Sequence, residues 1–264
     1  MTRVLIIGAT GRMGRALVRA ARERPGLRIA AAVARSGSEH VGQDVGDVAG
    51  TESLGVAIVD ELSGALAGCD VAVDFSQPAA AAANLAACVA AGRALLLGTT
   101  GLPAELHPEL DRAARHIAVL QAANTSLGVT LLLELVRRCA EVLPLKFDAE
   151  IIEAHHRHKK DAPSGTAWAL AQAIAHGRGQ SLEEVAALDR THGGARAEGE
   201  IGFAVVRGGD LVGEHTVMFA GPGEQVILGH RATDRGIFAA GALDAAAWLA
   251  RQAPGRYSMR DIIL

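Results

Sequence analysis

The chain has 264 residues and a formal net charge of −3, and half of its residues are apolar while only 3% are aromatic. This length suggests one large domain or two moderate ones, and we expect two domains with cores of Ala, Val, Leu and Ile. The weak negative charge argues against a nucleic-acid or anionic membrane partner, and the composition is that of an ordinary enzyme.

The first predicted strand is the apolar run Val4–Ile7, which is typical of a parallel strand buried on both faces. A glycine-rich turn follows it, and then a helix predicted over residues 15–23. The turn reads Gly8-Ala9-Thr10-Gly11-Arg12-Met13-Gly14. In order, its three glycines would permit a tight turn, admit a pyrophosphate close to the backbone and let the helix pack closely. Because the spacing is G-x-x-G-x-x-G, a tight turn without a ligand stays open as an alternative.

The end of the second predicted strand, residues 28–34, bears on the cofactor. About 20 residues after the glycine turn, dinucleotide-binding folds carry an acid for the ribose 2'-hydroxyl, whereas this chain has Ala34 and Arg35. A guanidinium can hold a 2'-phosphate and no carboxylate repels it, so these residues favour NADPH and leave NADH use open. A solvated loop arginine is the alternative.

Apolar runs and alanine-rich helical stretches continue to alternate along the first half. Strands are predicted at 71–75, 94–97 and 117–121, and helices at 79–91 and 104–115. This alternation indicates an α/β fold with a doubly wound, Rossmann-type parallel sheet.

The segments after these strands are expected to line the crevice at the carboxyl ends of the strands, where open α/β sheets bind ligands. They are Ser76-Gln77-Pro78, Gly98-Thr99-Thr100-Gly101 and Ala122-Ala123-Asn124-Thr125. We place Gly98-Thr99-Thr100 beside the nicotinamide, and a plain turn there is the alternative.

A different, α+β pattern begins after residue 125. It predicts a helix and a strand, and then three strands that we interpret as an antiparallel meander because turn-rich segments join them. These elements are expected at 127–142, 147–153, 201–206, 211–219 and 225–232. The polar, glycine-rich residues 177–199 are expected to form a mobile loop.

The last predicted helix, over 236–251, is expected to return to the first domain. The dinucleotide-binding domain would then comprise residues 1–125 and 236–264. Residues 126–235 would form a substrate-binding domain with a mixed, largely antiparallel sheet.

The densest chemical signal lies just after the strand at 147–153. Three histidines and two lysines occupy six positions, although arginine supplies nearly all other cations of the chain; they are His155, His156, His158, Lys159 and Lys160. Desolvation can bring the pKa of a lysine within reach of proton transfer, and imidazole titrates near neutrality, at about 6.5. The cluster therefore indicates acid catalysis on an anionic substrate. A solvated loop and a metal site are alternatives, but the spacing matches neither H-x-x-x-H nor H-E-x-x-H, and we predict no metal.

Residues 161–167 and a helical stretch over 168–175 are typical of a loop that ends in a helix N-terminus, with Ser164 as N-cap. Small residues there leave backbone N–H groups open to an anion. We expect a substrate carboxylate at Ser164, Gly165 and Thr166, with His156 and Lys159 nearby. Simple capping by Ser164 is the alternative.

The three cysteines indicate the compartment. Cys69, Cys88 and Cys139 are odd in number and lack any metal spacing, so we expect reduced, buried thiols. The first residues enter a strand without the features of a signal peptide, and no apolar stretch reaches the roughly 20 residues that span a bilayer. We therefore expect a cytoplasmic protein.

Taken together, these residues resemble the 4-hydroxy-tetrahydrodipicolinate reductases, formerly called dihydrodipicolinate reductases, of bacterial diaminopimelate and lysine biosynthesis. The resemblance covers essentially the whole chain, and its most specific part is EAHHRHKKDAPSGTA at residues 153–167. The supporting matches are residues 8–14, 98–101, 122–124, 213–216 and 259–261.

The resemblance implies roles for single residues. His155 would be the catalytic proton donor and acceptor, Lys159 a proton donor, and His156, Gly165 and Thr166 substrate contacts. It also implies cofactor contacts at 8–13, 98–100 and 122–125, a small dicarboxylate substrate, and a homotetramer formed through the sheet of the second domain. The chain departs from the family pattern at Ala34, where members that use both cofactors can carry an acid, and at Thr125, where some relatives have an aromatic residue.

The predicted function is the NAD(P)H-dependent reduction of 4-hydroxy-tetrahydrodipicolinate to tetrahydrodipicolinate. Hydride would reach the C4 end of a cyclic imine formed by loss of water, and Lys159 and His155 would supply the proton. Two alternatives stay open: another NADP-dependent imine or semialdehyde reductase, and a non-catalytic nucleotide-sensing domain.

Overall fold

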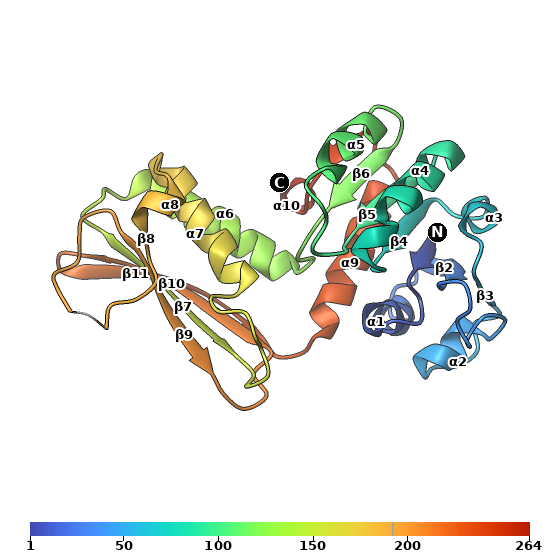
Figure 1. The fold of residues 1–264 in the computed structure, drawn as a ribbon, viewed down its shortest axis with the longest axis horizontal. Coiled ribbons are helices and arrows are strands. Elements are labelled where there is room, and N and C mark those ends of the chain that lie inside the picture. The colour runs from blue at the N-terminus through green and yellow to red at the C-terminus, as the bar shows by residue number, and fades with distance from the viewer. Residues whose placement is uncertain (192) are drawn as a thin grey trace. The chain divides into compact units, whose positions relative to one another are not determined.

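The computed structural model describes residues 1–191 and 193–264, which form two compact units (Figure 1). The first unit contains Met1–Ser126 and Gly236–Leu264, and the second contains Leu127–Arg235. Each unit has its own sheet and its own helices.

The first unit is built on a seven-stranded parallel sheet with the order β12-β6-β5-β4-β1-β2-β3. The strands are β1 Thr2–Ile7, β2 Leu27–Val33, β3 Ile58–Val59, β4 Val71–Asp74, β5 Ala94–Leu97, β6 Ala118–Gln121 and β12 Gly255–Tyr257. The order reverses between β1 and β4, which is the switch point of a doubly wound sheet, so the predicted fold class is confirmed. Central strands such as β4 are wholly buried because helices cover both faces, and this explains apolar runs such as Val71–Val73.

Helices cover both faces of this sheet, as Figure 1 shows. Helices α1 and α9 pack against one face and α3, α4 and α5 against the other. The helices are α1 Arg12–Ala21, α2 Val45–Ala49, α3 Leu62–Leu66, α4 Ala81–Ala91, α5 Leu106–Ala113, α9 Gly236–Leu249 and α10 Arg260–Ile263, with a 3-10 turn, η1, at Pro78–Ala80.

The second unit is built on a five-stranded mixed sheet with the order β11-β10-β7-β9-β8. The strands are β7 Asp148–His155, β8 Ala186–Ala187, β9 Ile201–Arg207, β10 Gly213–Gly221 and β11 Glu224–Ala232. The predicted meander is wrong, because β7 lies between β9 and β10 and pairs with β9 in parallel. Only β10 and β11 form the predicted hairpin. The alternation of a strand specifies which side chains face the core but not which strand lies beside it.

Helices α6 Leu127–Val142 and α7 Gly165–Arg178 lie side by side on one face of this sheet (Figure 1). Their apolar residues and the inward side chains of the strands, such as Ile151 and Phe219, form the core. The opposite face carries exposed apolar side chains: Ile152 is 40% exposed and Ile227 is 61% exposed.

Residues 177–199, expected to be a mobile loop, begin with regular structure. They include the last two residues of α7, helix α8 Leu182–Val185 and strand β8. Residue 192 of this stretch lies outside the described residues. In the part of the chain that the structure describes, no helix is both long and apolar enough to cross a membrane.

Candidate active site

The glycine turn after β1 has the geometry that a dinucleotide phosphate requires. Gly8 has a φ of +81°, and the N–H groups of Gly8 and Ala9 donate to the Val33 carbonyl at 2.9 and 3.0 Å. A Cβ on Gly14 would lie 2.3 Å from the Gly8 carbonyl oxygen, so only glycine lets α1 approach the turn this closely. Helix α1 begins after Gly11 without a capping side chain, which leaves its first amides without a side-chain acceptor. A pyrophosphate fits this donor set.

Backbone hydrogen bonds join the turn segments that follow β1, β4, β5 and β6. Phe75 N–H donates to the carbonyl of Ile7, the last residue of β1, at 3.2 Å, and Gly98 N–H donates to Asp74 at 2.9 Å. Ala122 N–H donates to the carbonyl of Leu97 at 3.0 Å. The glycine turn and the segments predicted to line the crevice therefore lie side by side at the carboxyl ends of the parallel strands. They follow the strand order β1-β4-β5-β6.

Asp74 is a residue of this edge that the sequence analysis did not single out. It is fully buried, and its carboxylate accepts hydrogen bonds from Ser76 N–H at 2.8 Å, Asn84 Nδ2 at 2.8 Å and Thr99 Oγ1 at 3.4 Å. One carboxylate thus orients two of the segments predicted to line the crevice. An acid that closes an otherwise apolar strand, Val71–Asp74, is the signal that could have revealed it.

Two predicted cofactor residues differ in what they present to solvent. Arg35 is exposed. It lies two residues after Val33, whose carbonyl accepts the hydrogen bonds from Gly8 and Ala9 of the glycine turn. Thr125 is 2% exposed, and its hydroxyl donates to the Phe238 carbonyl at 2.6 Å. The Thr125 side chain therefore ties the segment to α9. Of the remaining predicted residues, Thr100 and Ala123 are exposed.

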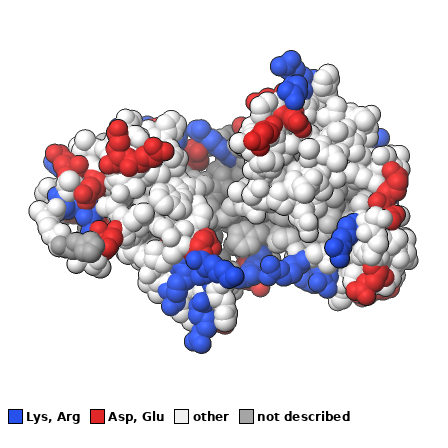
Figure 2. Space-filling model, viewed as in Figure 1, with Lys and Arg blue, Asp and Glu red and all other residues white. Residues whose placement is uncertain are grey.

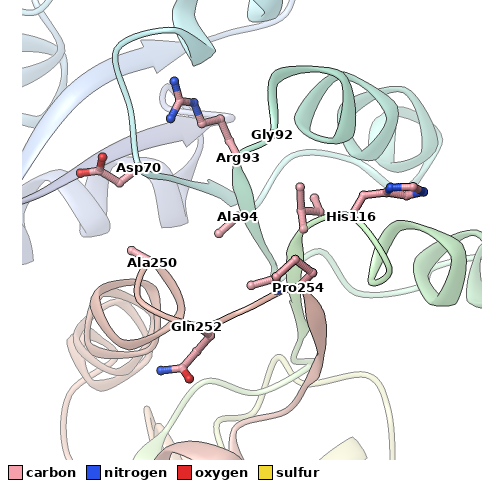
Figure 3. Close-up of a pocket in the computed structure, with 10 residues that line it drawn as sticks. Asp70, Gly92, Arg93, Ala94, His116, Ala250, Gln252 and Pro254 are labelled. Carbon is pink, nitrogen blue, oxygen red and sulfur yellow. The ribbon is translucent and has the colours of Figure 1, made fainter.

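A cavity of about 250 Å³ lies at the opposite end of the same sheet. Figure 3 shows it at the start of β5 and beside Pro254, with Asp70, Arg93 and His116 on its wall. Because Ala94 and Ala118 begin their strands, this cavity lies at the amino ends and away from the glycine turn. It does not overlap the predicted cofactor segments.

The second unit brings the histidine cluster to the end of β7. His155 is the last residue of β7 and is 8% exposed, and Lys159 Nζ forms an ion pair with Asp161 at 2.9 Å. Burial lowers the pKa of His155 below its ordinary value, the hydrogen bond with Glu153 opposes this, and the charge of Lys159 adds to it. His155 and Lys159 therefore belong to one electrostatic cluster.

The loop that carries Lys159 is held to the turn between β9 and β10. His156 N–H donates to the Leu211 carbonyl at 2.8 Å, and Arg157 N–H donates to the Gly209 carbonyl at 3.2 Å. Figure 2 shows Lys and Arg side chains gathered at this end of the second unit, where β7 and β9 end. The cationic residues of these segments are Arg157, Lys159, Lys160 and Arg207. Such a surface attracts a small anion.

The N-terminus of α7 lies beside this cluster, and the predicted cap is confirmed. Ser164 Oγ accepts a hydrogen bond from Ala167 N–H at 3.2 Å and lies 3.1 Å from His215 Nε2. The helix begins at Gly165, three residues earlier than predicted; Gly165 is exposed and Thr166 is half-buried. Ser164 is 2% exposed, so its side chain serves the helix and His215 and does not face solvent.

Glu153 lies at the centre of the cluster, and the sequence analysis gave it no role. It is 1% exposed and accepts a forked pair of hydrogen bonds from Arg207, each at 2.8 Å. Its carboxylate also lies 2.5 Å from His155 Nδ1 and accepts the Ser164 N–H at 3.0 Å. Burial raises the pKa of Glu153, but the bonds from Arg207, His155 and Ser164 outweigh it and hold the pKa below its usual value. The alternation of β7, which places residues 149, 151, 153 and 155 on the buried face, is the signal that could have indicated it.

His215, on β10, is the remaining buried member of the cluster. Its ring meets that of His155 edge to face, with centroids 5.1 Å apart. Burial lowers the pKa of His215 to about 4, so this imidazole is neutral at physiological pH. No group of three His, Cys, Asp or Glu side chains that could hold a metal ion occurs among the described residues.

Comparison with known proteins identifies the family. The family model of the dihydrodipicolinate reductase N-terminus matches residues 2–125, and that of the C-terminus matches residues 128–263. The 4-hydroxy-tetrahydrodipicolinate reductase of Halorhodospira halophila is 51% identical over 98% of this chain and 97% of its own length. The enzyme of the same name from Anaeromyxobacter dehalogenans strain 2CP-C is 48% identical over 100% of this chain and 98% of its own length.

A solved structure agrees with this assignment. The dipicolinate-bound dihydrodipicolinate reductase of Paenisporosarcina sp. TG-14 superimposes with a TM-score of 0.81 at 25% identity, with 100% of both chains covered. Two family models that match residues 2–125 and 128–263, and relatives near 50% identity over nearly the whole chain, show the family. The chain belongs to the 4-hydroxy-tetrahydrodipicolinate (dihydrodipicolinate) reductases and is an NAD(P)H-dependent oxidoreductase.

Proposed function

We propose that this chain reduces 4-hydroxy-tetrahydrodipicolinate to tetrahydrodipicolinate with NADPH, in the diaminopimelate route to lysine. The observation that carries the proposal is the buried His155–Glu153 pair, which shares one electrostatic cluster with Lys159 and lies beside the N-terminus of α7. This arrangement offers a proton donor and an anion site in one place, which the reduction of an anionic imine requires.

The first unit is proposed as the dinucleotide-binding domain. Residues 8–13 would hold the pyrophosphate, Arg35 the 2'-phosphate, and residues 98–100 and 122–125 the nicotinamide end. When bound, the nicotinamide supplies a hydride to the C4 end of the cyclic imine that remains after the substrate loses water. Asp74 keeps the segments after β4 and β5 in place.

The second unit is proposed as the substrate-binding domain. The amides of Gly165 and Thr166 would hold one substrate carboxylate, with His156 and Lys159 supplying positive charge. The solved relative with bound dipicolinate is consistent with a planar dicarboxylate in this role. Lys159 and His155 would then deliver the proton that balances the hydride.

The proposed function is tested by NADPH oxidation, followed with substrate that is generated in the cuvette by condensing pyruvate with aspartate semialdehyde. Rapid loss of NADPH is expected only when both precursors are present. A panel of other imines and semialdehydes distinguishes a different reductase on the same scaffold. Tight NADPH binding without oxidation by any of them would contradict the proposal and favour a nucleotide-sensing protein.

The preference for NADPH depends on Arg35. We expect Arg35→Ala to raise the KM for NADPH by about 10- to 100-fold and to leave the KM for NADH unchanged, because only NADPH carries the 2'-phosphate. Steady-state kinetics with both cofactors measure this difference. Arg115→Ala, which removes another exposed arginine of the same unit, should change neither value. Equal effects of Arg35→Ala on both cofactors would contradict the assignment.

The open face of the second sheet supports a proposed homotetramer. Ile152 and Ile227 are exposed there, and Met218 pairs with Ile227 across β10 and β11. Large apolar side chains exposed on a sheet face are typical of an interface between subunits. We also propose a cytoplasmic location, because Cys69, Cys88 and Cys139 are all free thiols, as expected in a reducing compartment.

A further inference from the structure

We propose that Glu153, clamped by Arg207, is a positioning residue that fixes His155 as its Nδ1–H tautomer and leaves Nε2 to exchange the proton. This inference rests on the proposed role of His155 and adds the residues that make that role work. Glu153 and His155 are two positions apart on β7, so both side chains point to the same buried face.

The hydrogen on Nδ1 follows from the state of the carboxylate. Arg207 donates to both oxygens of Glu153 and the Ser164 N–H donates to one, and these bonds hold the carboxylate ionised. An ionised carboxylate can only accept hydrogen bonds, so His155 Nδ1, at 2.5 Å from it, must be the donor. A neutral His155 then carries its lone pair on Nε2.

On the Nε2 side of the ring, residue 213 is glycine and adds no side chain against this nitrogen. A Cβ built on Gly213 would lie 3.0 Å from His155 Nε2 and 3.3 Å from His155 Cδ2. Any larger residue would press on the nitrogen that the tautomer leaves free. Glu153 therefore sets the tautomer at Nδ1, and Gly213 keeps a side chain away from Nε2.

The charged and titratable groups around His155 come from three strands and the adjoining loop. They are Glu153 on β7, Arg207 on β9, His215 on β10 and Lys159 on the loop after β7. Arg207 also donates to the Asp161 carbonyl at 2.7 Å, which ties the loop of Lys159 to the same clamp. Glu153 is the only anion in this set, so its removal leaves Arg207 and Lys159 to lower the pKa of His155 further.

The surroundings of the carboxylate predict how a glutamine would lie in its place. Oε1 faces two fixed donors, the Ser164 N–H and Arg207 Nη2. Oε2 faces Arg207 Nη1 and His155 Nδ1, and the ring nitrogen can also accept. The amide oxygen would therefore take the Oε1 position, and the NH₂ group would donate to Nδ1. The neutral ring would then carry its hydrogen on Nε2, and that atom could no longer accept a proton.

The test combines long-range ¹H–¹⁵N NMR of His155 with kinetics of the full-length enzyme. The wild-type ring should be the Nδ1–H tautomer, and Glu153→Gln should convert it to Nε2–H and lower kcat by about 10- to 100-fold without changing NADPH affinity. The matched control is Glu141→Gln on α6, which also removes a carboxylate paired with two arginines, Arg137 and Arg138, and should change neither tautomer nor kcat.

The outcomes separate this inference from the proposed function. An Nε2–H ring in the wild-type enzyme overturns the inference, even if Glu153→Gln does not fold. So does a Glu153→Gln enzyme that loses kcat but keeps the Nδ1–H ring, since Glu153 would then be a structural residue. By contrast, wild-type turnover of His155→Gln would remove the proposed role of His155 itself.

Discussion

Lys159→Ala is expected to lower kcat by about 10²- to 10⁴-fold while the affinity for NADPH stays unchanged. The side chain of Lys159 is 21% exposed and is paired with Asp161 at the end of the histidine cluster, so its ammonium is held in place rather than free in solvent. Removing it takes away both a proton donor and a positive charge for the substrate carboxylates. The cofactor segments belong to the first unit, and for this reason NADPH binding should not respond.

The measurement is the NADPH oxidation assay together with a fluorescence titration of NADPH. Lys146→Ala is the matched control, because it removes an exposed lysine of the same unit outside the cationic cluster and should preserve turnover. An enzyme that keeps its kcat without Lys159 would show that the proton comes from another group.

Gly14→Ala is expected to destabilise the first unit and to abolish NADPH binding. The added Cβ would lie 2.3 Å from the Gly8 carbonyl oxygen and 2.6 Å from the Ala9 Cα, and these are backbone atoms of the turn itself. Neither atom can rotate away, so α1 would have to move away from the glycine turn. Its first backbone amides, which are proposed to bind the phosphates, would move with it. Overpacking typically costs about 1–3 kcal/mol, and we expect the upper end of this range or more.

Chemical denaturation and NADPH titration measure the two effects of Gly14→Ala. Gly26→Ala is the control, since a Cβ on Gly26 meets no atom within 4 Å and its φ is not positive, so the variant should retain wild-type stability. Wild-type NADPH affinity in Gly14→Ala would mean that close contact between α1 and the turn is not needed.

Local sequence patterns were sufficient for most helices and strands. The strand at 94–97 and the helix at 127–142 have the predicted bounds, because a continuous apolar run and a helical apolar period are properties of neighbouring residues. The start of α7 was predicted three residues late. The small residues after Ser164 carry no apolar period, although the cap itself marks the boundary.

The pairing of β9 was not predictable in the same way. Its inward residues Ile201 and Phe203 would suit either neighbour, and the short glycine-containing turn to β10 suggested a hairpin. The structure instead inserts β7 between them, because the partner of a strand is chosen by contacts across the whole sheet. A turn motif reports only on the residues within it.

The sequence by itself determined the doubly wound sheet, the glycine turn and the family, because all three depend on short runs of residues. The density of histidines and lysines at residues 155–160 indicated acid catalysis, and the resemblance to the family singled out His155 and Lys159. Only the tertiary structure placed Arg207, 54 residues away along the chain, on both oxygens of Glu153, and Gly213 against His155 Nε2. Such contacts arise where the ends of β7, β9 and β10 meet. The sequence records the residue types but not the strand order that brings them together, and long-range pairing sets that order.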